Sequence, residues 1–334
     1  GIFSIKPFSF DVAMNGSNNN YYLKSMNFST SAGFLLKGKK KDYCDFISEV
    51  NLKPDKEVMD QVCDILRKYE KGESSMTILG AQLKDEPRLY DKVKRGKTRV
   101  FAMSSFDMIL VQRMFLMPFY SLMVQESELF SCALGINMHS KSAVKRFDKL
   151  NTFSPNIISG DYAGYDSSMP VLVGYSCNSI VYNVCKKMGY NEYALRMVSG
   201  ILSDNLFPVL SLEGNLLKVP GFQPSGKYAT AEDNSLRNLF LLMYAFDDLT
   251  DLPLEDFFLH MMPMTYGDDI LCASRSENFN NLSYSQYCNE IYGMTFTNTD
   301  KDCHRTKFDV IHDVEFLKRK MRYHPYLERD VLVL

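Results

Sequence analysis

Apolar residues in this chain follow two different spacings, which indicates a mixture of helices and strands. Helical spacing predicts helices at Lys56–Lys71, Phe106–Gln125 and Met169–Met188, and a further helix near Ser283–Gly293. A short apolar run at Asn156–Gly160 predicts a buried strand instead. Strands interspersed with helices in this order indicate an α+β fold, in which an antiparallel sheet is backed by helices.

Two apolar runs, His260–Thr265 and Ile270–Ala273, flank the tetrad Tyr266–Asp269 (YGDD). The runs predict two short strands and the Gly-Asp pair predicts the turn, so two acids lie at the tip of a hairpin. Adjacent carboxylates beside apolar sequence repel each other and lose hydration, and a bound divalent cation relieves both costs. Oxygen ligands at a tight turn suit Mg²⁺ or Mn²⁺. An ordinary solvated turn remains an alternative for the tetrad alone.

A second acidic pair follows the strand predicted at Asn156–Gly160. Asp161 stands at the end of that strand, and Asp166 follows one tight turn later. Two-metal phosphoryl transfer requires carboxylates from separate chain segments, so Asp161 and Asp268 are the natural pair of bridging ligands. A turn at Asp161 and a helix cap at Asp166 explain either residue alone, but explain both less well.

A third polar segment begins at Ser225-Gly226 and continues with Thr230, Asn234 and Asn238 at about one helical turn each. Small polar side chains at this spacing share a helix face and can hydrogen-bond a sugar or base without adding charge. The glycine lets a ligand approach the backbone closely. Helix capping is the alternative for Ser225, and it explains one residue rather than the series.

Residues Gly221–Lys227 fit the first part of a phosphate-binding Walker loop, G-x4-G-K. Position 228 is Tyr, where that loop requires Ser or Thr to bind Mg²⁺. The preceding Leu216–Pro220 contains a proline, which is unfavourable in a central strand. We therefore assign this segment to the polar series and not to a Walker loop.

Composition agrees with a globular enzyme: the 334 residues are 46% hydrophobic and 23% charged, with a net charge of −2. Basic charge is concentrated locally, since Lys84–Arg99 contains seven Lys or Arg against three acids and Lys37–Lys41 forms a second cluster. Local positive potential attracts phosphates even in a neutral protein. The placement of Lys92, Lys97 and Arg99 favours a phosphate-binding strand or loop, whereas a solvated surface is an equal alternative for the second cluster.

Eight cysteines occur without a CxxC pair, which does not support zinc ribbons or thioredoxin chemistry and suits reduced thiols in the cytosol. Cys303-His304 and His312 match no standard metal-site spacing. No signal peptide is visible. The longest apolar stretch, Met108–Val124, is interrupted by Gln112 and Arg113, so it predicts a buried helix and no transmembrane segment.

Taken together, these segments resemble the ordered motifs of RNA-dependent RNA polymerases from picornavirus-like positive-strand RNA viruses. The matching segments are Ser29–Gly33 (motif G), Lys84–Arg99 (F), Asp161–Asp166 (A), Ser225–Asn234 (B), Tyr266–Asp269 (C), Tyr292–Lys301 (D) and Phe316–Arg319 (E). Seven motifs in the family's order span nearly the whole chain, so the ordered set is highly specific. Two departures are Pro87 in motif F and Ala229, which stands where relatives often carry glycine.

The resemblance implies a right-hand polymerase with fingers at residues 1–150 and a palm at 151–315, with part of 195–222 returning to the fingers. Residues 316–334 would hold motif E, the primer grip, and the start of the thumb. The mostly helical thumb of the family is therefore expected to be largely absent, and the chain is expected to be a fragment of a polyprotein.

The resemblance also implies a role for each candidate residue in two-metal RNA synthesis with Mg²⁺, for which Mn²⁺ can substitute. The metal ligands would be Asp161, Asp268 and Asp269, and Lys301 would be the general acid, although a plain solvated lysine is an equal alternative. The nucleotide and its ribose would be bound by Asp166, Ser225, Gly226, Thr230, Asn234, Lys92, Lys97 and Arg99. RNA would be bound by Thr30, Ser31, Lys84, Arg88, Lys318 and Arg319.

Expected partners are template RNA, a primer and NTPs, together with a viral protein primer and other replication proteins. The expected location is the host cytoplasm, at membrane-associated replication complexes. Two alternatives remain: a non-catalytic RNA-binding or scaffold fragment, and a reverse transcriptase. The second is disfavoured because a reverse transcriptase typically carries a larger residue in place of Gly267 and lacks this motif B series.

Overall fold

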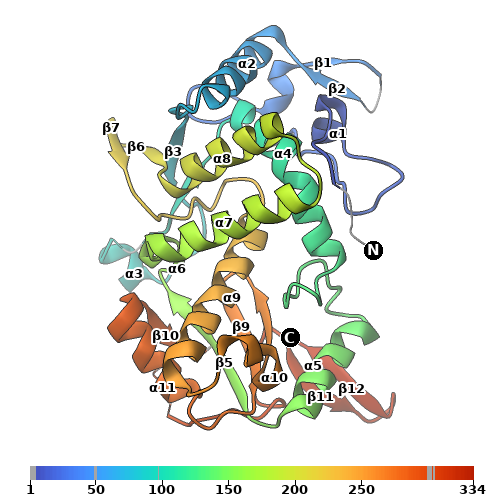
Figure 1. The fold of residues 1–334 in the computed structure, drawn as a ribbon, viewed down its shortest axis with the longest axis vertical. Coiled ribbons are helices and arrows are strands. Elements are labelled where there is room, and N and C mark those ends of the chain that lie inside the picture. Colours follow the sequence, from blue (N-terminus) through green and yellow to red (C-terminus); the bar gives the residue numbers. More distant parts are fainter. Residues whose placement is uncertain (1–4, 49–50, 97, 299–302, 304) are drawn as a thin grey trace. The chain divides into compact units, whose positions relative to one another are not determined.

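The computed structural model describes residues 5–48, 51–96, 98–298, 303 and 305–334, and its elements are shown in Figure 1. The chain forms two compact units, each made from two stretches of sequence. The first unit comprises Gly1–Leu122 and Gly174–Thr230, and the second comprises Met123–Val173 and Ala231–Leu334. Each helix that crosses one of these boundaries is assigned to the unit that holds most of its residues.

The first unit contains seven helices and six strands among its described residues. The helices are α1 (Phe10–Asn15), the 3₁₀ turn η1 (Lys40–Tyr43), α2 (Lys56–Glu70), α3 (Tyr90–Lys94), α4 (Phe106–Gln125), α7 (Val171–Lys187) and α8 (Glu192–Leu206). The strands are β1 (Cys44–Phe46), β2 (Leu52–Pro54), β3 (Ile78–Leu83), β4 (Val100–Met103), β6 (Val209–Leu212) and β7 (Asn215–Lys218).

Helix α2 illustrates how local sequence determines these elements. The Asp55 carboxylate accepts a hydrogen bond from the Val58 N–H at 3.0 Å and so caps the first turn. Val58, Val62, Ile65 and Tyr69 then recur on one face and are all buried. The helix predicted at Lys56–Lys71 is therefore confirmed within one residue.

Helix α4 has the bounds predicted from the sequence, and it is long and apolar enough to cross a membrane by length and composition. In the structure, 78% of that apolar window is buried in protein. Its two interrupting polar residues have partners inside the first unit. Gln112 donates to Asn205 Oδ1 at 2.9 Å, and the Arg113 guanidinium donates to the carbonyls of Ala13 and Lys24. These contacts are those of a core helix.

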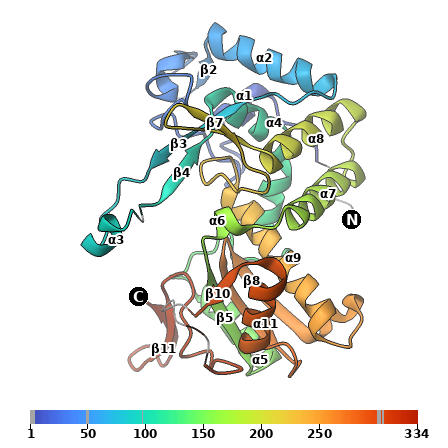
Figure 2. The ribbon, with the colours of Figure 1, turned by 90° about the vertical axis from the view of Figure 1, so that its left-hand side faces the viewer.

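The first unit is built around a four-stranded sheet with the order β4-β3-β6-β7, in which β3 and β6 are parallel and the other pairs are antiparallel. The segment that joins β3 to β4 extends from the sheet as an arm with α3 at its tip (Figure 2). Strand β7 is an edge strand, and Pro220 follows it outside the sheet. The proline therefore does not interrupt a central strand.

The second unit holds the predicted acidic segments. Its helices are α5 (Lys141–Phe153), α6 (Tyr165–Ser168), α9 (Thr230–Leu249), η2 (Leu254–Asp256), α10 (Phe257–His260), α11 (Asn281–Tyr287) and the π-helical turn η3 (Cys288–Tyr292). Its strands are β5 (Ile157–Ala163), β8 (Met261–Tyr266), β9 (Asp269–Ser274), β10 (Thr295–Thr297), β11 (Lys320–His324) and β12 (Arg329–Val333).

An antiparallel sheet with the order β10-β5-β9-β8 forms the centre of the second unit. Helix α5 packs on one face, where its Phe147 and Leu150 join Ile157 and Leu271 in a buried cluster. Helices α9 and α11 lie on the other face, where Tyr162 of β5 hydrogen-bonds Asn238 and Tyr284. This is the antiparallel sheet backed by helices that the sequence predicts.

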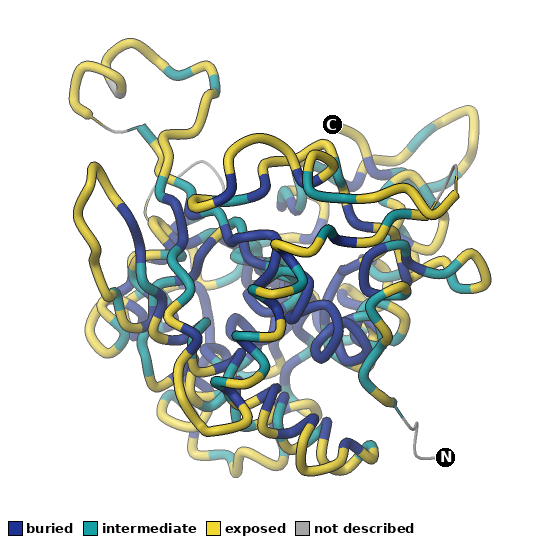
Figure 3. The backbone as a smooth tube through the Cα atoms, turned by 90° about the horizontal axis from the view of Figure 1, so that it is seen from above, coloured by how far each residue is buried: buried dark blue, intermediate teal, exposed yellow. Residues whose placement is uncertain are grey.

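Strands β8 and β10 are the edges of this sheet. Strand β10 is three residues long, and β8 contains Pro263. Near its end, β8 is bridged by Ser131–Ala133: the Thr265 N–H donates to the Ser131 carbonyl at 3.0 Å, and the Ala133 N–H donates to the Thr265 carbonyl at 2.8 Å. In both units, buried stretches of backbone alternate with exposed loops (Figure 3).

Candidate active site

The YGDD tetrad forms the tight hairpin predicted from its flanking runs. Tyr266 at the end of β8 pairs with Asp269 at the start of β9, which leaves Gly267 and Asp268 as a two-residue turn. Gly267 has a φ of +61°, a conformation in which a side chain is strained. The glycine therefore permits the turn that places Asp268 at the hairpin tip.

Asp161 lies in β5, next to the strand that carries Asp269 in the sheet order. It follows Gly160, and a Cβ atom at Gly160 would lie 2.4 Å from the Thr297 carbonyl oxygen and 2.5 Å from the Phe296 ring. Only glycine allows β10 to approach so closely at this point. Strand β5 continues to Ala163, beyond the end predicted at Asp161, because β10 pairs with Asp161–Ala163, and this pairing fixes Asp161 on its β10 side.

The carboxyl group of Asp268 is strongly affected by that of Asp161. Burial and the charge of Asp161 raise the pKa of Asp268 to about 6, and a hydrogen bond between the two carboxyl groups and the charge of Asp166 contribute to the same shift. Such a rise is expected where carboxylates crowd together with little water. The second unit therefore brings together acids from motifs A and C, as the sequence predicts.

Two buried residues of α9 hold the hairpin turn in place. The Ser235 hydroxyl accepts a hydrogen bond from the Gly267 N–H at 2.8 Å and donates to the Ala231 carbonyl at 2.7 Å. Asn238 donates to the Gly267 carbonyl at 3.1 Å and accepts from Tyr162 at 3.3 Å. Both side chains are fully buried, so Asn238 positions the turn instead of contacting a sugar or base.

The proposed ribose-binding pair lies close together in the second unit. Asn234 donates to Asp166 Oδ1 at 3.5 Å, and the Tyr165 hydroxyl donates to the Asn234 backbone carbonyl at 2.9 Å. Asp166 lies in the short helix α6, which begins after Gly164 in the left-handed conformation. The amide of Asn234 thus orients a carboxylate that remains partly exposed.

The motif B loop belongs to the first unit and packs against β4. The Gly226 N–H donates to the Ala102 carbonyl at 2.9 Å, and a Cβ atom at Gly226 would lie 2.3 Å from that oxygen. Thr230 directs its hydroxyl at carbonyls of its own loop, including that of Lys227 at 3.0 Å, while Ser225 is exposed. The glycine is therefore required by the packing of the loop on β4.

The Walker-like lysine of this loop is buried. Lys227 is 7% exposed and donates to Gln223 Oε1 at 2.8 Å. A phosphate-binding lysine must be presented to solvent, so the assignment of this segment to motif B and not to a Walker loop is consistent with its geometry.

The basic arm of motif F is organised by one acid, Glu86. Its carboxylate pairs with Arg88 at 2.6 Å, Arg99 at 2.5 Å and Lys84 at 3.8 Å. Hydrogen bonds from Arg99 and then Arg88 lower the pKa of Glu86 to about 2. Arg99 remains 58% exposed and Lys84 48% exposed. Both cations can therefore reach an anion from outside, while Glu86 sets their spacing.

The arm also contains the candidate residues Lys92 and Lys97. Lys92 lies in α3, but its side chain is outside the described part of the structure, as is the whole of Lys97. The segment was predicted to be a strand or loop, whereas residues Tyr90–Lys94 form a short helix between two extended stretches.

The motif G loop is held by the buried side chain of Lys40. Its ammonium donates to Thr30 Oγ1 at 2.5 Å and to the Ser31 carbonyl at 2.8 Å, and burial lowers its pKa. Thr30 and Ser31 themselves are exposed. The loop therefore presents two hydroxyl side chains above a buried cation.

Motif E forms a second tight hairpin in the second unit. Phe316 and Arg319 exchange backbone hydrogen bonds of 2.9 and 3.0 Å, and both turn residues, Leu317 and Lys318, have positive φ. Lys318 is exposed at the tip, and Arg319 contacts His139 at 3.3 Å. A turn with two non-glycine residues in this conformation is strained, which is typical of functional sites.

Comparison with known proteins gives the wider context of this site. The model of the family described as viral RNA-dependent RNA polymerase matches residues 3–333. The chain belongs to this family. The polymerase relatives include the replicase polyprotein of acute bee paralysis virus (strain Rothamsted), 26% identical over 95% of this chain and 18% of the polyprotein. They also include the genome polyprotein of human parechovirus 5 (strain CT86-6760), 28% identical over 91% of this chain and 13% of the polyprotein.

A solved structure shows the polymerase fold. The chain matches the Sicinivirus 3Dpol RNA-dependent RNA polymerase with a TM-score of 0.85 and 19% identity, over 100% of this chain and 67% of that one. The predicted right-hand polymerase fold is thereby confirmed. The chain spans less than a fifth of the length of each of the two polyproteins cited. The boundaries of fingers, palm and thumb stay predictions.

The family implies divalent metal ions, and the residues present suit them. Among the described residues, no group of three or more His, Cys, Asp or Glu side chains could hold a metal ion. Magnesium, however, is commonly held by one or two carboxylates together with substrate phosphates, not by an all-protein cage. Asp161 and Asp268 supply such a pair. Lys301, the candidate general acid, lies outside the described residues.

The sequence did not identify three residues that position the candidate site residues: Ser235, Glu86 and Lys40. Each acts through another residue, and its importance depends on contacts that form only in the folded chain. Of the three, only Ser235 could have been found from the sequence, because it stands next to Asn234 in the polar series of motif B.

Proposed function

We propose that this chain catalyses template-directed RNA synthesis from NTPs and replicates a positive-strand RNA virus genome. The observation that carries this proposal is the pair formed by Asp161 and Asp268, whose carboxyl groups come from separate strands and share an electrostatic environment. Membership of the polymerase family supports the same reaction. Two Mg²⁺ ions, or Mn²⁺ in their place, would supply activation of the primer 3′-hydroxyl and charge neutralisation at the pyrophosphate.

The residues of the chain then have separate tasks. Asp161 and Asp268 would hold the metal ions, with Asp269 as a weaker ligand, while Ser235 and Asn238 keep the turn in position. Because Asp268 retains its proton up to about pH 6, metal ions must displace that proton below this pH. The site is therefore proposed to fill more readily at neutral pH than in acid.

The nucleotide would be bound by charge and hydrogen bonds from the other motifs. Arg99, with Lys92 and Lys97, would neutralise the triphosphate, and Lys301 would protonate the pyrophosphate. Asp166, oriented by Asn234, would accept a hydrogen bond from the ribose 2′-hydroxyl, the group that distinguishes ribonucleotides from deoxyribonucleotides. Ser225, Gly226 and Thr230 would shape the loop against template and nucleotide.

RNA would be bound by exposed groups at turns and along the arm. Lys318 and Arg319 of motif E would grip the primer backbone, Thr30 and Ser31 would contact the template, and Lys84 and Arg88 would add positive charge. We also infer a viral protein primer and activity at membrane-associated complexes in the host cytoplasm, because the relatives belong to replicase and genome polyproteins.

Primer extension on a short RNA hairpin with Mg²⁺ and NTPs tests the proposal. The Asp268→Asn variant should lose incorporation by about 10³-fold or more, since metal stabilisation of the transition state contributes several kcal/mol. Retained incorporation by this variant would exclude Asp268 from the metal site. Salt-sensitive RNA binding without synthesis by the wild-type protein would instead indicate a binding or scaffold fragment, and preferential use of dNTPs would indicate a reverse transcriptase.

The Asp166→Asn variant tests the sugar site in the same assay. Loss of one hydrogen bond to a charged group corresponds to roughly ten- to a hundredfold in the preference for NTPs over dNTPs. Unchanged discrimination would remove Asp166 from ribose recognition. Asp91→Asn, which removes an exposed acid from the motif F arm, is the matched control and should leave the preference unchanged.

A further inference from the structure

The first unit contains a cavity of about 430 Å³ that the polymerase motifs do not use. Its walls come from α2, from the segment 75–78 that leads into β3, from the N-terminal end of α4, and from Leu35 and Leu36. All of these segments belong to the same compact unit, so the cavity is formed within that unit.

Two buried side chains in the cavity wall have polar atoms that lack a hydrogen-bond partner. Ser105 is 5% exposed and Asp107 is 9% exposed, and neither Ser105 Oγ nor Asp107 Oδ1 makes a hydrogen bond within the described part of the chain. Leaving such a buried atom unpaired is unfavourable, because it has lost its hydrogen bond to water. A ligand that donates a hydrogen bond to Asp107 and pairs with Ser105 would remove this cost.

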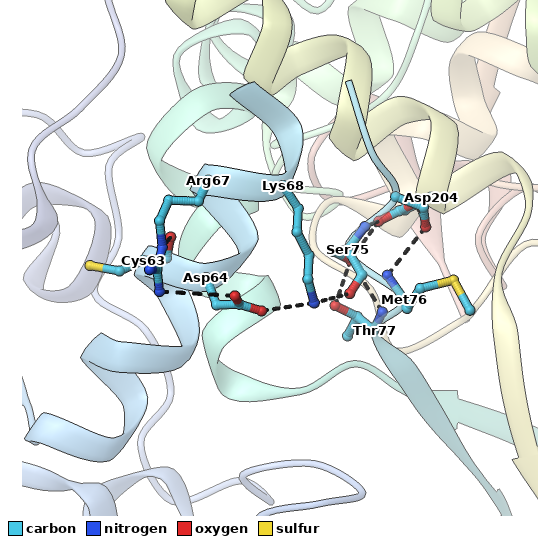
Figure 4. A network of polar contacts seen from close by, with 9 residues as sticks. Cys63, Asp64, Arg67, Lys68, Ser75, Met76, Thr77 and Asp204 are labelled. Atoms are coloured by element: carbon cyan, nitrogen blue, oxygen red, sulfur yellow. Dashed lines mark hydrogen bonds and ion pairs between the residues drawn. The ribbon is translucent and has the colours of Figure 1, made fainter. Parts of the chain in front are cut away.

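The charge of the wall indicates what kind of ligand fits. Asp60, Asp64 and Asp107 line the cavity, against one cation, Lys68. The Lys68 ammonium is already used, because it pairs with Asp64 at 2.7 Å and donates to the Ser75 carbonyl at 3.3 Å (Figure 4). Burial raises the pKa of Asp107, although the Ser105 hydroxyl and the backbone N–H groups of Met108 and Asp107 lie near enough to lower it. The cavity therefore favours a ligand that carries positive charge.

The residues that line the cavity favour an alkyl chain with a charged end. Among the described residues, no three acids are placed to hold a metal ion, so these carboxylates do not converge on one point. The wall also contains Leu36, Ile65 and Ile78, which offer apolar surface to methylene groups. An extended molecule with a charged end and an apolar stem matches both properties.

We propose that this cavity binds an alkyl cation, an aliphatic ammonium or guanidinium group, whose charged end hydrogen-bonds Asp107 and Ser105. The same chemistry is found in free amines and in the Lys or Arg side chains of a protein. The site adjoins motif G: a Cβ atom at Gly33 would lie 2.6 Å from the Ser105 Cα atom, and the Phe106 N–H donates to the Ala32 carbonyl at 2.8 Å.

Isothermal titration of the full chain with n-butylamine tests the proposal, with 1-butanol as the uncharged ligand of equal length. The amine should bind saturably and about tenfold or more tightly than the alcohol. Asp107→Asn should weaken amine binding by about tenfold, and Ser105→Ala by a smaller factor. Asp45→Asn, which removes an exposed carboxylate outside the cavity wall, should bind like the wild type.

Either of two results would overturn the proposal: no saturable amine binding, or equal binding by wild type, Asp107→Asn and Ser105→Ala. If Asp107→Asn does not fold, Ser105→Ala decides alone. Competition by a capped tripeptide with a central lysine would assign the site to a protein side chain. Failure of that peptide to displace bound amine would assign it to free amines.

Discussion

At the scale of single residues, the site is defined by groups held in energetically unfavourable states. Asp268 retains its proton to an unusually high pH because it is buried beside Asp161. Ala229, Leu317 and Lys318 adopt left-handed backbone conformations without being glycine. Such costs are expected where a chain is selected for binding and chemistry as well as for stability.

The raised pKa of Asp268 predicts a specific dependence of stability on pH. The folded protein binds this proton up to about pH 6, whereas the unfolded chain releases it near 3.8, so the contribution to stability is complete below 3.8 and is lost as pH rises through 6. Without divalent cations, Asp268→Asn should avoid this loss and be more stable than wild type at pH 7 by roughly 3 kcal/mol.

Urea denaturation at several pH values, in the presence of a chelator, measures this difference. The free energies of unfolding of wild type and Asp268→Asn should diverge between pH 4 and 6, and Mg²⁺ should narrow the gap by stabilising wild type alone. Parallel curves across this range would show that Asp268 is not strained by its neighbours.

The left-handed conformation of Ala229, with φ of +57°, predicts that glycine is better tolerated there. The strain of about 1–2 kcal/mol exceeds the entropy that glycine adds to the unfolded chain, so Ala229→Gly should stabilise the protein by about 0.5–1 kcal/mol. Ala231→Gly, two residues later in α9, should destabilise it by up to about 1 kcal/mol. Thermal denaturation compares the two; a loss of stability in both would contradict the prediction.

At the scale of elements, helix α9 connects motif A with the YGDD turn. It carries Asn234 against motif A, and it carries Ser235 and Asn238 against the YGDD turn. The turn is therefore fixed by a helix that begins inside motif B, at Thr230. This arrangement positions the acids of two strands through a single rigid element.

Removing the Asn238 amide should disturb this arrangement. Asn238→Ala removes the side-chain donor to the buried Gly267 carbonyl and one of the two hydrogen-bond partners of the Tyr162 hydroxyl, which should cost about 1–3 kcal/mol of stability. Below the unfolding temperature, kcat for nucleotide incorporation should fall while KM for NTP changes little. Asn183→Ala, at an exposed position of α7, is the control and should change neither. An increase in KM alone would place Asn238 in nucleotide binding.

The same scale shows what the sequence could predict. The spacing of apolar residues was sufficient to predict α2, α4 and the YGDD hairpin, because their local patterns and turn residues agree with the fold. Spacing did not reveal the role of Asn238. It suggested a contact with a ligand, whereas the side chain is buried and holds the turn. It also missed Glu86, because three cations that are separated in the sequence converge on one carboxylate only after the arm has folded.

At the scale of the whole molecule, the two units divide the motifs between them. Motifs F and G and the motif B loop belong to the first unit, whereas the acids of motifs A and C and the motif E hairpin belong to the second. Each unit has its own four-stranded sheet and a separate two-stranded one, β1-β2 in the first unit and β11-β12 in the second. The family match extends across both, so the polymerase fold comprises these two units together.

The distribution of cysteines predicts how the intact chain reacts with thiol reagents. All eight are free thiols: Cys63 and Cys303 are exposed, Cys44 is half-buried, and the other five are buried. Burial raises the pKa of Cys132 to about 11 and that of Cys185 to about 12, which suppresses their reactive thiolates.

Titration with a chromogenic disulfide reagent should therefore show two fast thiols and one slow thiol, with five that react only after unfolding. Replacing Cys63 with serine should remove one fast equivalent and no other. Rapid reaction of five or more thiols in the native protein would mean that the buried positions are accessible in solution.

The edges of the four-stranded sheet in the second unit affect whether the protein aggregates at high concentration. Strand β10 is too short to offer a long ladder of free backbone groups, and β8 carries a proline and is bridged by residues Ser131–Ala133 near its end. An open edge would recruit strands from neighbouring molecules and template cross-β aggregates. These features leave little edge for such pairing, so many copies can accumulate at one place without this sheet acting as a seed for fibres.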